Sequence, residues 1–177
     1  MSIMIPAWVN GSLVPVEKLE AHKRGFKHKA VSVFILQNDN VLLQQRALEK
    51  YHTPGLWANT CCTHPDWDED PNDCAVRRLN EELGIKNLNL EHRHHLEYRA
   101  KVGGGLIEHE VVDVYVGYAP PNFQVELNPD EVMAIEWLSF TDIKSAIEQN
   151  PERFTPWLKI YMAEHANTIF GDDLVHL

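Results

Sequence analysis

The strongest apolar pattern in the chain is AVSVFILQ at residues 30–37, which is hydrophobic at almost every position. A continuous apolar run of this length is typical of a strand buried on both faces of a sheet. An Asn-Asp-Asn turn separates it from a second strand at residues 41–46, and AWVNGSLVPV at residues 7–16 predicts a hairpin with a tight Asn-Gly turn. Further strands are expected at residues 88–101, 106–118 and 131–138, with a Gly-Gly-Gly turn at 103–105.

Helical spacing is clearest between Asp70 and Gly84, where Asp70 can cap the first turn, Pro71 is tolerated within it and Gly84 offers a stop. The predicted apolar stripe of this helix consists of Ala75, Val76, Leu79 and Leu83, and its other faces carry Arg77, Arg78, Glu81 and Glu82. Other helical segments are expected at residues 16–25 (a short helix or turn), from Ser139 or Thr141 to about residue 149, and at 155–170. Mixed strands and helices without a linker predict one α/β domain over residues 1–177.

The composition changes this picture mainly through its charge. Of the 177 residues, 44% are hydrophobic and 24% are charged, as in ordinary globular proteins, and the formal net charge of −10 argues against general nucleic-acid binding. An anionic substrate would therefore need a local basic pocket. The chain has no apolar run of membrane-spanning length and no signal-peptide pattern, and its three cysteines suggest reduced thiols, so a cytoplasmic protein without membrane contact is expected.

Two stretches carry candidate chemistry. Residues 59–69 (NTCCTHPDWDE) place two thiols, an imidazole and several acids in a short loop before the helix. Glu108 and Glu110 alternate with His109 on a predicted strand, so both carboxylates face one side, where they repel unless a cation or a basic group lies between them. Taken singly, each histidine, basic residue, cysteine or aromatic in the chain is more often an ordinary surface or core residue.

The segment from Thr63 to Ile85 reads T-x5-E-x7-R-R-L-x-E-E-x-G-I and resembles the Nudix box, G-x5-E-x7-R-E-U-x-E-E-x-G-U, in which U is apolar. It departs at Thr63, which replaces the first glycine, and at Arg78, which replaces a metal-binding glutamate. A guanidinium cannot ligate a metal, but it can bind phosphate oxygens as a fork. Together with the preceding NTCCTHP, the altered box is similar to that of type 1 isopentenyl-diphosphate delta-isomerases.

This resemblance implies a Nudix-like α/β/α sandwich with a mixed sheet, and conversion of isopentenyl diphosphate to dimethylallyl diphosphate in isoprenoid biosynthesis. It assigns one divalent metal (Mn²⁺, Zn²⁺ or Mg²⁺) to His22, His28, His64, Glu108 and Glu110, and a substrate-bound Mg²⁺ to Glu82. It assigns the diphosphate to Lys18, Arg46, Lys50 and Arg78, and an aromatic wall over the isoprenoid to Trp157. The catalytic residues that it implies are Cys62, Glu110 and Tyr98, while Cys61, Cys74, Glu69 and Glu81 are expected to be structural.

The main alternative is a Nudix-type diphosphate hydrolase, which would share the scaffold and the Mg²⁺ on Glu82. Arg78 argues against it, because the box then lacks one carboxylate. A structural zinc protein would need paired ligand spacing that is absent, and nothing marks the oxyanion hole of a cysteine-histidine hydrolase. We therefore expect a small-molecule diphosphate as the partner, with no obligate protein partner, and the tail after Phe170 is expected to be surface.

Overall fold

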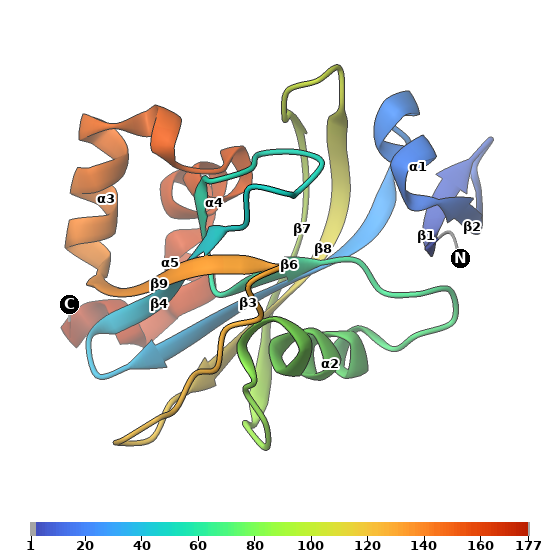
Figure 1. Cartoon of the computed structure of the whole chain (residues 1–177). Coiled ribbons are helices and arrows are strands. Elements are labelled where there is room, and N and C mark those ends of the chain that lie inside the picture. The colour runs from blue at the N-terminus through green and yellow to red at the C-terminus, as the bar shows by residue number, and fades with distance from the viewer. Residues whose placement is uncertain (1–2, 177) are drawn as a thin grey trace.

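A mixed β-sheet forms the centre of the molecule, and helices cover both of its faces (Figure 1). The computed structural model describes residues 3–176. Within these residues the sheet has nine strands, which are β1 (Met4–Val9), β2 (Ser12–Glu17), β3 (His28–Gln37), β4 (Asn40–Arg46), β5 (Trp57–Ala58), β6 (Cys61–Thr63), β7 (Leu90–Lys101), β8 (Ile107–Tyr118) and β9 (Val132–Ser139). All strands expected from the sequence are present, and β5 and β6 were not expected.

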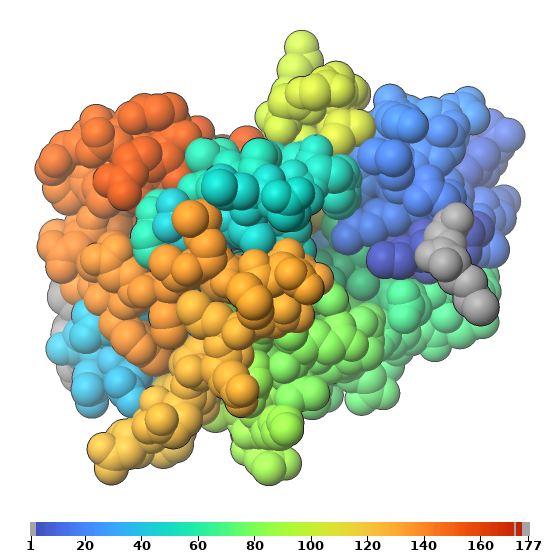
Figure 2. All heavy atoms as spheres, viewed as in Figure 1, coloured from blue at the N-terminus to red at the C-terminus, as the bar shows by residue number. Residues whose placement is uncertain are grey.

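Strand β3 organises the sheet, because four other strands pair with it. It runs parallel to β8 from His28 to Leu36 and antiparallel to β1, β4 and β6. Strands β7 and β8 form a long antiparallel hairpin whose tip projects beyond the rest of the molecule (Figures 1 and 2). The parallel pair and the hairpin together make the sheet mixed, as expected.

The helices are α1 (Lys18–Arg24), α2 (Pro71–Leu83), α3 (Phe140–Gln149), α4 (Pro156–Ile160) and α5 (Ala166–Phe170). Helix α2 covers one face of the sheet, whereas α3, α4 and α5 lie on the other (Figure 1). Alternate residues of β3 enter two cores: Val33 and Ile35 pack with Leu79 of α2, and Phe34 packs with Leu158 of α4. This confirms that β3 is buried on both faces.

Helix α2 has the caps that its sequence predicts. The Asp70 side chain accepts a hydrogen bond from a backbone N–H of the first turn, and Gly84 ends the helix at φ +64°. The predicted apolar stripe was wrong at Val76, which is 42% exposed, whereas Cys74 is buried. The placement of Glu82 on an outer face was also wrong, because its side chain is only 3% exposed. At 100° per residue, Val76 lies beyond the edge of the buried face, while Glu82 shares that face with its apolar neighbours.

Residues 155–170, expected to form one helix, are helical but do not form one regular α-helix. Between α4 and α5 the backbone forms a π-helical turn, Tyr161–His165. Such turns insert one extra residue and reorient the following side chains, and they occur often at functional sites. The Tyr161 side chain at the start of this turn is fully buried.

The tail after Phe170 is attached to the body. It forms a 3-10 turn, Gly171–His176, in which Leu174 packs against the core. The Asp173 carboxylate accepts a hydrogen bond of 2.8 Å from the Tyr118 hydroxyl. The prediction of a surface segment was therefore wrong for Leu174, whereas the Asp173 hydrogen bond does lie at the surface.

The loop between β4 and β5 lies against α1 on the face shown in Figure 2. The Lys18 ammonium group is 5.6 Å from the centre of the Tyr51 ring, which joins the two segments. None of the helices within residues 3–176 is long and apolar enough to cross a membrane.

Candidate active site

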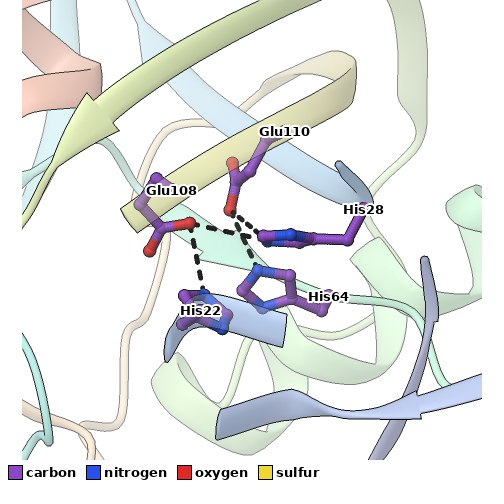
Figure 3. A group of neighbouring side chains, drawn as sticks. All are labelled: His22, His28, His64, Glu108 and Glu110. Atoms are coloured by element: carbon purple, nitrogen blue, oxygen red, sulfur yellow. Dashed lines mark hydrogen bonds and ion pairs between the residues drawn. The ribbon is translucent and has the colours of Figure 1, made fainter. Parts of the chain in front are cut away.

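Five buried side chains from separate parts of the chain meet at one point (Figure 3). His22 comes from α1, His28 begins β3, His64 follows β6, and Glu108 and Glu110 lie on β8. One nitrogen or oxygen atom from each lies within 4.8 Å of every other. The structure thus brings together all five residues that the resemblance assigned to one metal.

The register of the sheet explains much of this convergence. His28 is the partner of Glu110 across the parallel pair β3–β8, and Tyr98 is the partner of Glu110 across the hairpin β7–β8. Glu108 precedes Glu110 by two residues and therefore points to the same face of the sheet. Helix α1 adds His22, whose ring centre is 4.7 Å from that of His28.

Local hydrogen bonds prepare two of the histidines to bind a cation. The Nδ1 atom of His22 lies 2.6 Å from the Lys18 carbonyl oxygen, and that of His28 lies 2.7 Å from the Phe26 carbonyl oxygen. A carbonyl only accepts, so both Nδ1 atoms carry hydrogen and the Nε2 atoms face inward, as in many metal sites. Within residues 3–176, the buried His28 Nε2 and Glu108 Oε2 have no hydrogen-bond partner. These orphaned atoms fit a divalent cation between them.

The two buried carboxylates of the cluster also need positive charge near them. Burial and the neighbouring Glu108 raise the pKa of Glu110 to about 8. Burial lowers the pKa of His28, but the nearby carboxylates of Glu108 and Glu110, each 3.7 Å from Nε2, outweigh it and raise the pKa to about 9. Burial keeps the pKa of His64 well below its usual value, so this imidazole is neutral. Protons on His28 and Glu110 supply the charge that a metal ion would otherwise provide.

His52 also belongs to the site, although the sequence analysis did not single it out. Its Nε2 atom lies 3.0 Å from Glu108 Oε1, whereas His22 and His28 face the other oxygen of that carboxylate, Oε2. The neighbouring Thr53 holds a positive φ of 46°, a strained conformation for a β-branched residue, and its hydroxyl lies 3.0 Å from His52 Nδ1. The His52 ring also packs edge-on against Trp157, and the Arg46 guanidinium lies 5.3 Å from the centre of the indole. The sequence offered one signal for His52: it lies two residues after Lys50, which the resemblance assigns to the diphosphate.

A cavity of about 440 Å³, counted to its open mouth, lies beside the cluster. The residues that line it are Lys18, Arg46, Lys50, Tyr51, His52, Cys62, Thr63, His64, Arg78, Tyr98, Glu108, Glu110 and Trp157. All the residues that the resemblance named as catalytic, diphosphate-binding or aromatic therefore line this one cavity.

The cavity concentrates positive charge in an acidic protein. Lys18, Arg46, Lys50 and Arg78 all line it, from four different segments. Burial, opposed in part by Glu82, lowers the pKa of Lys50 to about 8. The sequence analysis missed Glu131, which forms ion pairs with Lys50 and with Arg78 (3.2 Å). An anionic ligand would have to displace or share these pairs.

Glu82 lies behind this basic group. Its Oε1 atom is 2.6 Å from Arg78 Nη2, and its Oε2 atom accepts a hydrogen bond of 2.9 Å from Gln44. Both oxygens are therefore occupied, and binding of a metal ion by Glu82 would require Arg78 to turn toward the ligand.

The three cysteines have different surroundings. Cys62 lines the cavity, whereas Cys61 of β6 and Cys74 of α2 are buried in the core between α2 and the sheet. Burial raises the pKa of the Cys62 thiol, although the hydrogen bond with Ser32 opposes this shift. On the Glu110 carboxylate, the Tyr98 hydroxyl donates a hydrogen bond of 2.7 Å to Oε2, and His64 Nε2 lies 2.9 Å from Oε1.

Sequence comparison identifies the family. The NUDIX domain profile matches residues 26–158. A protein of Roseobacter denitrificans named isopentenyl-diphosphate Delta-isomerase is 66% identical over 172 residues, which is 97% of this chain and 98% of that protein. A protein of Ruegeria pomeroyi with the same name is 62% identical and covers 99% of this chain and 97% of its own length. The chain belongs to the isopentenyl-diphosphate Delta-isomerase family.

Solved structures with lower sequence identity to this chain share its fold. A crystal structure of DR0079 from Deinococcus radiodurans superposes with a TM-score of 0.70 at 13% identity and covers 90% of this chain and 96% of that one. A MutT NUDIX hydrolase from Burkholderia pseudomallei gives a TM-score of 0.61 at 21% identity, with 78% and 98% covered. The expected Nudix-like α/β/α sandwich is confirmed. Thr63, in place of the first box glycine, lies in the extended strand β6 and so needs no glycine conformation.

Proposed function

We infer that this protein converts isopentenyl diphosphate to dimethylallyl diphosphate, the reaction for which its family is named. The enzyme moves a carbon–carbon double bond without cleaving the diphosphate. We place this step in isoprenoid biosynthesis in the cytoplasm, with the small-molecule diphosphate as the only partner required.

The observation that supports this inference most strongly is the set of side chains that line the cavity beside the histidine–carboxylate cluster. It combines a thiol, Cys62, and a carboxylate, Glu110, with a group of four cations. An alkene isomerase needs an acid and a base on its substrate, and a diphosphate ester needs an anion site at a fixed distance from them. A cavity of this kind satisfies both requirements.

The reaction requires one proton to be added and another to be removed. Protonation of the terminal alkene carbon gives a tertiary carbocation, and loss of a proton from the carbon nearer the diphosphate completes the rearrangement. We assign these two transfers to Cys62 and Glu110. The Tyr98 hydroxyl, which donates to Glu110 Oε2, holds this carboxyl in place and can relay its proton. The indole face of Trp157 can stabilise the cation, an effect worth about 2 kcal/mol in a desolvated site.

The cluster of three histidines and two carboxylates fits one divalent cation, for which we propose Mn²⁺, Zn²⁺ or Mg²⁺. A bound cation would supply the positive charge that allows Glu108 and Glu110 to be ionised side by side. We further propose that Glu82 binds a Mg²⁺ ion together with the diphosphate. Arg78 would then leave Glu82 and bind phosphate oxygens with Lys18, Arg46 and Lys50.

Arg78 also separates this proposal from diphosphate hydrolysis. In the Nudix box this position carries a carboxylate of the metal cluster, whereas here it holds a guanidinium that lines the cavity. The hydrolytic metal cluster would therefore lack a ligand, and the phosphate would gain a cationic partner.

The test is product analysis. Purified protein is incubated with isopentenyl diphosphate, Mg²⁺ and Mn²⁺, and the products are separated by chromatography while released phosphate is measured. We expect dimethylallyl diphosphate and no phosphate. Isopentenyl monophosphate with free phosphate would contradict the inference and establish a hydrolase. A parallel reaction with Cys62→Ala controls for a contaminating isomerase, because that variant should form no product.

A further inference from the structure

A chain of hydrogen-bonded, buried side chains ends at the Cys62 thiol. Its members are Asn59, Ser32 and Tyr161, and their side chains are at most 1% exposed. Among the described residues that line the cavity are Cys62 and Tyr98, but not these three. These three side chains thus lie outside the cavity lining, and the resemblance assigned no role to them.

The orientation of Asn59 is fixed by the backbone. Its Nδ2 atom donates hydrogen bonds to the carbonyl oxygens of Val33 (3.0 Å) and Cys61 (3.1 Å). The other amide atom, Oδ1, must then face Cys62 Sγ, at 2.8 Å. An amide oxygen has no hydrogen to give, so the thiol donates its only hydrogen to Asn59.

The remaining hydrogen positions follow by counting donors. Ser32 Oγ lies 3.1 Å from Cys62 Sγ and 2.9 Å from the Tyr161 hydroxyl oxygen. Because the sulfur has already donated its hydrogen, Ser32 must donate to the sulfur. Because Ser32 has thus used its only hydrogen, Tyr161 must donate to Ser32. The chain runs in one direction, from Tyr161 through Ser32 and Cys62 to Asn59.

Strand register and the π-helical turn place the members of this hydrogen-bonded chain. Ser32 is the register partner of Cys62 across β3 and the short strand β6, so the two side chains lie on the same face. Tyr161 stands at the start of the π-helical turn, and its ring packs edge-on against Tyr98 at 5.9 Å and against Phe34 at 5.9 Å. These contacts hold the phenol in place. A regular helix would present the following side chains at different angles.

We propose that Ser32 and Tyr161 are positioning residues for the Cys62 thiol. They direct its hydrogen toward Asn59 in the resting protein and keep a hydroxyl donor on the sulfur throughout the reaction. Whichever way the proton passes, the sulfur carries negative charge at one point of the cycle, and a hydrogen bond to a charged group is stronger than one to a neutral group. This inference rests on the proposed function only where turnover is measured.

The kinetic test uses Ser32→Ala, Tyr161→Phe and the double variant. Loss of a hydrogen bond to a charged sulfur should lower kcat about tenfold to a hundredfold in Ser32→Ala, and loss of a neutral one should lower it about twofold to tenfold in Tyr161→Phe. KM should stay within about twofold, because neither side chain lines the cavity. If Tyr161 acts through Ser32, the double variant should match Ser32→Ala rather than multiply the two losses. Wild-type kcat in Ser32→Ala, or fully multiplicative losses, would overturn the proposal.

The matched control is Tyr115→Phe, which removes a phenol hydroxyl from the opposite face of the sheet and should leave kcat unchanged. Thermal unfolding of each variant separates lost folding from lost positioning.

A spectroscopic test needs no turnover. The infrared S–H stretching band of Cys62 is isolated by subtracting the spectrum of Cys62→Ala. Removal of the donor in Ser32→Ala should weaken the S–H donation to Asn59 and move the band to higher frequency, and Asn59→Ala should move it further. An unchanged band in Ser32→Ala would overturn the proposal even if the isomerase activity is present. A shifted band in a protein without isomerase activity would instead refute the proposed function alone.

Discussion

Metal binding to the histidine–carboxylate cluster should depend steeply on pH. The pKa of His28 is raised to about 9 and that of Glu110 to about 8. At pH 7 both groups therefore hold a proton in the metal-free protein, and a cation has to displace both, because metal ligands must be deprotonated. Lower pH favours the protons, so metal affinity falls as pH falls.

The size of the effect follows from the number of protons. Each displaced proton changes the affinity about tenfold per pH unit, so the affinity should rise about a hundredfold per unit below pH 8. Between about pH 8 and pH 9 only His28 still holds its proton, and the slope should fall to about tenfold per unit. Binding at pH 7 should release close to two protons.

The assay is calorimetry with Mn²⁺ in competition with a chelator, from about pH 6.5 to 8.5, in buffers of different ionisation enthalpy. His28→Gln should reduce the release at pH 7 by about one proton, because Gln has no group that titrates there. His109→Gln is the matched control: His109 lies between the two glutamates in sequence but pairs with Glu97 on the other face, so this variant should behave like the wild type. Metal affinity independent of pH, or unchanged proton release in His28→Gln, would refute the reasoning.

Three further predictions concern single residues. Cys62→Ala should remain folded and keep its metal while losing nearly all turnover. Cys61→Ala, which changes a side chain in the core beneath α2, should stay active. A near-wild-type kcat in Cys62→Ala would contradict the catalytic assignment. Glu82→Gln should raise the Mg²⁺ concentration needed for half-maximal turnover at least about tenfold without changing metal content at the histidine cluster, and an unchanged Mg²⁺ titration would remove Glu82 from that role. Trp157→Leu should lower kcat about thirtyfold if the ring contributes about 2 kcal/mol to the cation, while Trp157→Phe loses less; equal kcat in the two variants would exclude a π contribution.

Much of the fold could be predicted because its elements carry strong local signals. The Asp70 and Gly84 caps predict the ends of α2, and the Glu-x-Glu alternation predicts that Glu108 and Glu110 share a face. Strands β5 and β6 could not be found in this way, since two or three residues are too few to show a period. The π-helical turn at Tyr161 was also not predicted, because α4 and α5 have only five residues each, too few on either side of the turn to show a shift in the apolar period.

The missed site residues share one physical feature: tertiary pairing brings them to the site. Ser32 meets Cys62 only because β6 pairs with β3, and His52 meets Glu108 only because a loop folds over the cavity. Glu131 reaches the basic group from the segment before β9. The cluster of three histidines and two glutamates was predicted only through the resemblance, because its members are too far apart in sequence for their spacing to indicate a metal site.

The most direct test of the account is a proton NMR time course of the purified protein with isopentenyl diphosphate and Mg²⁺ in D₂O. Proton addition by one group and removal by another predicts dimethylallyl diphosphate with deuterium in its methyl groups, because the donating group exchanges with solvent. Unchanged isopentenyl diphosphate, with both metals verified in the sample, or release of phosphate without an allylic product would contradict the central claim.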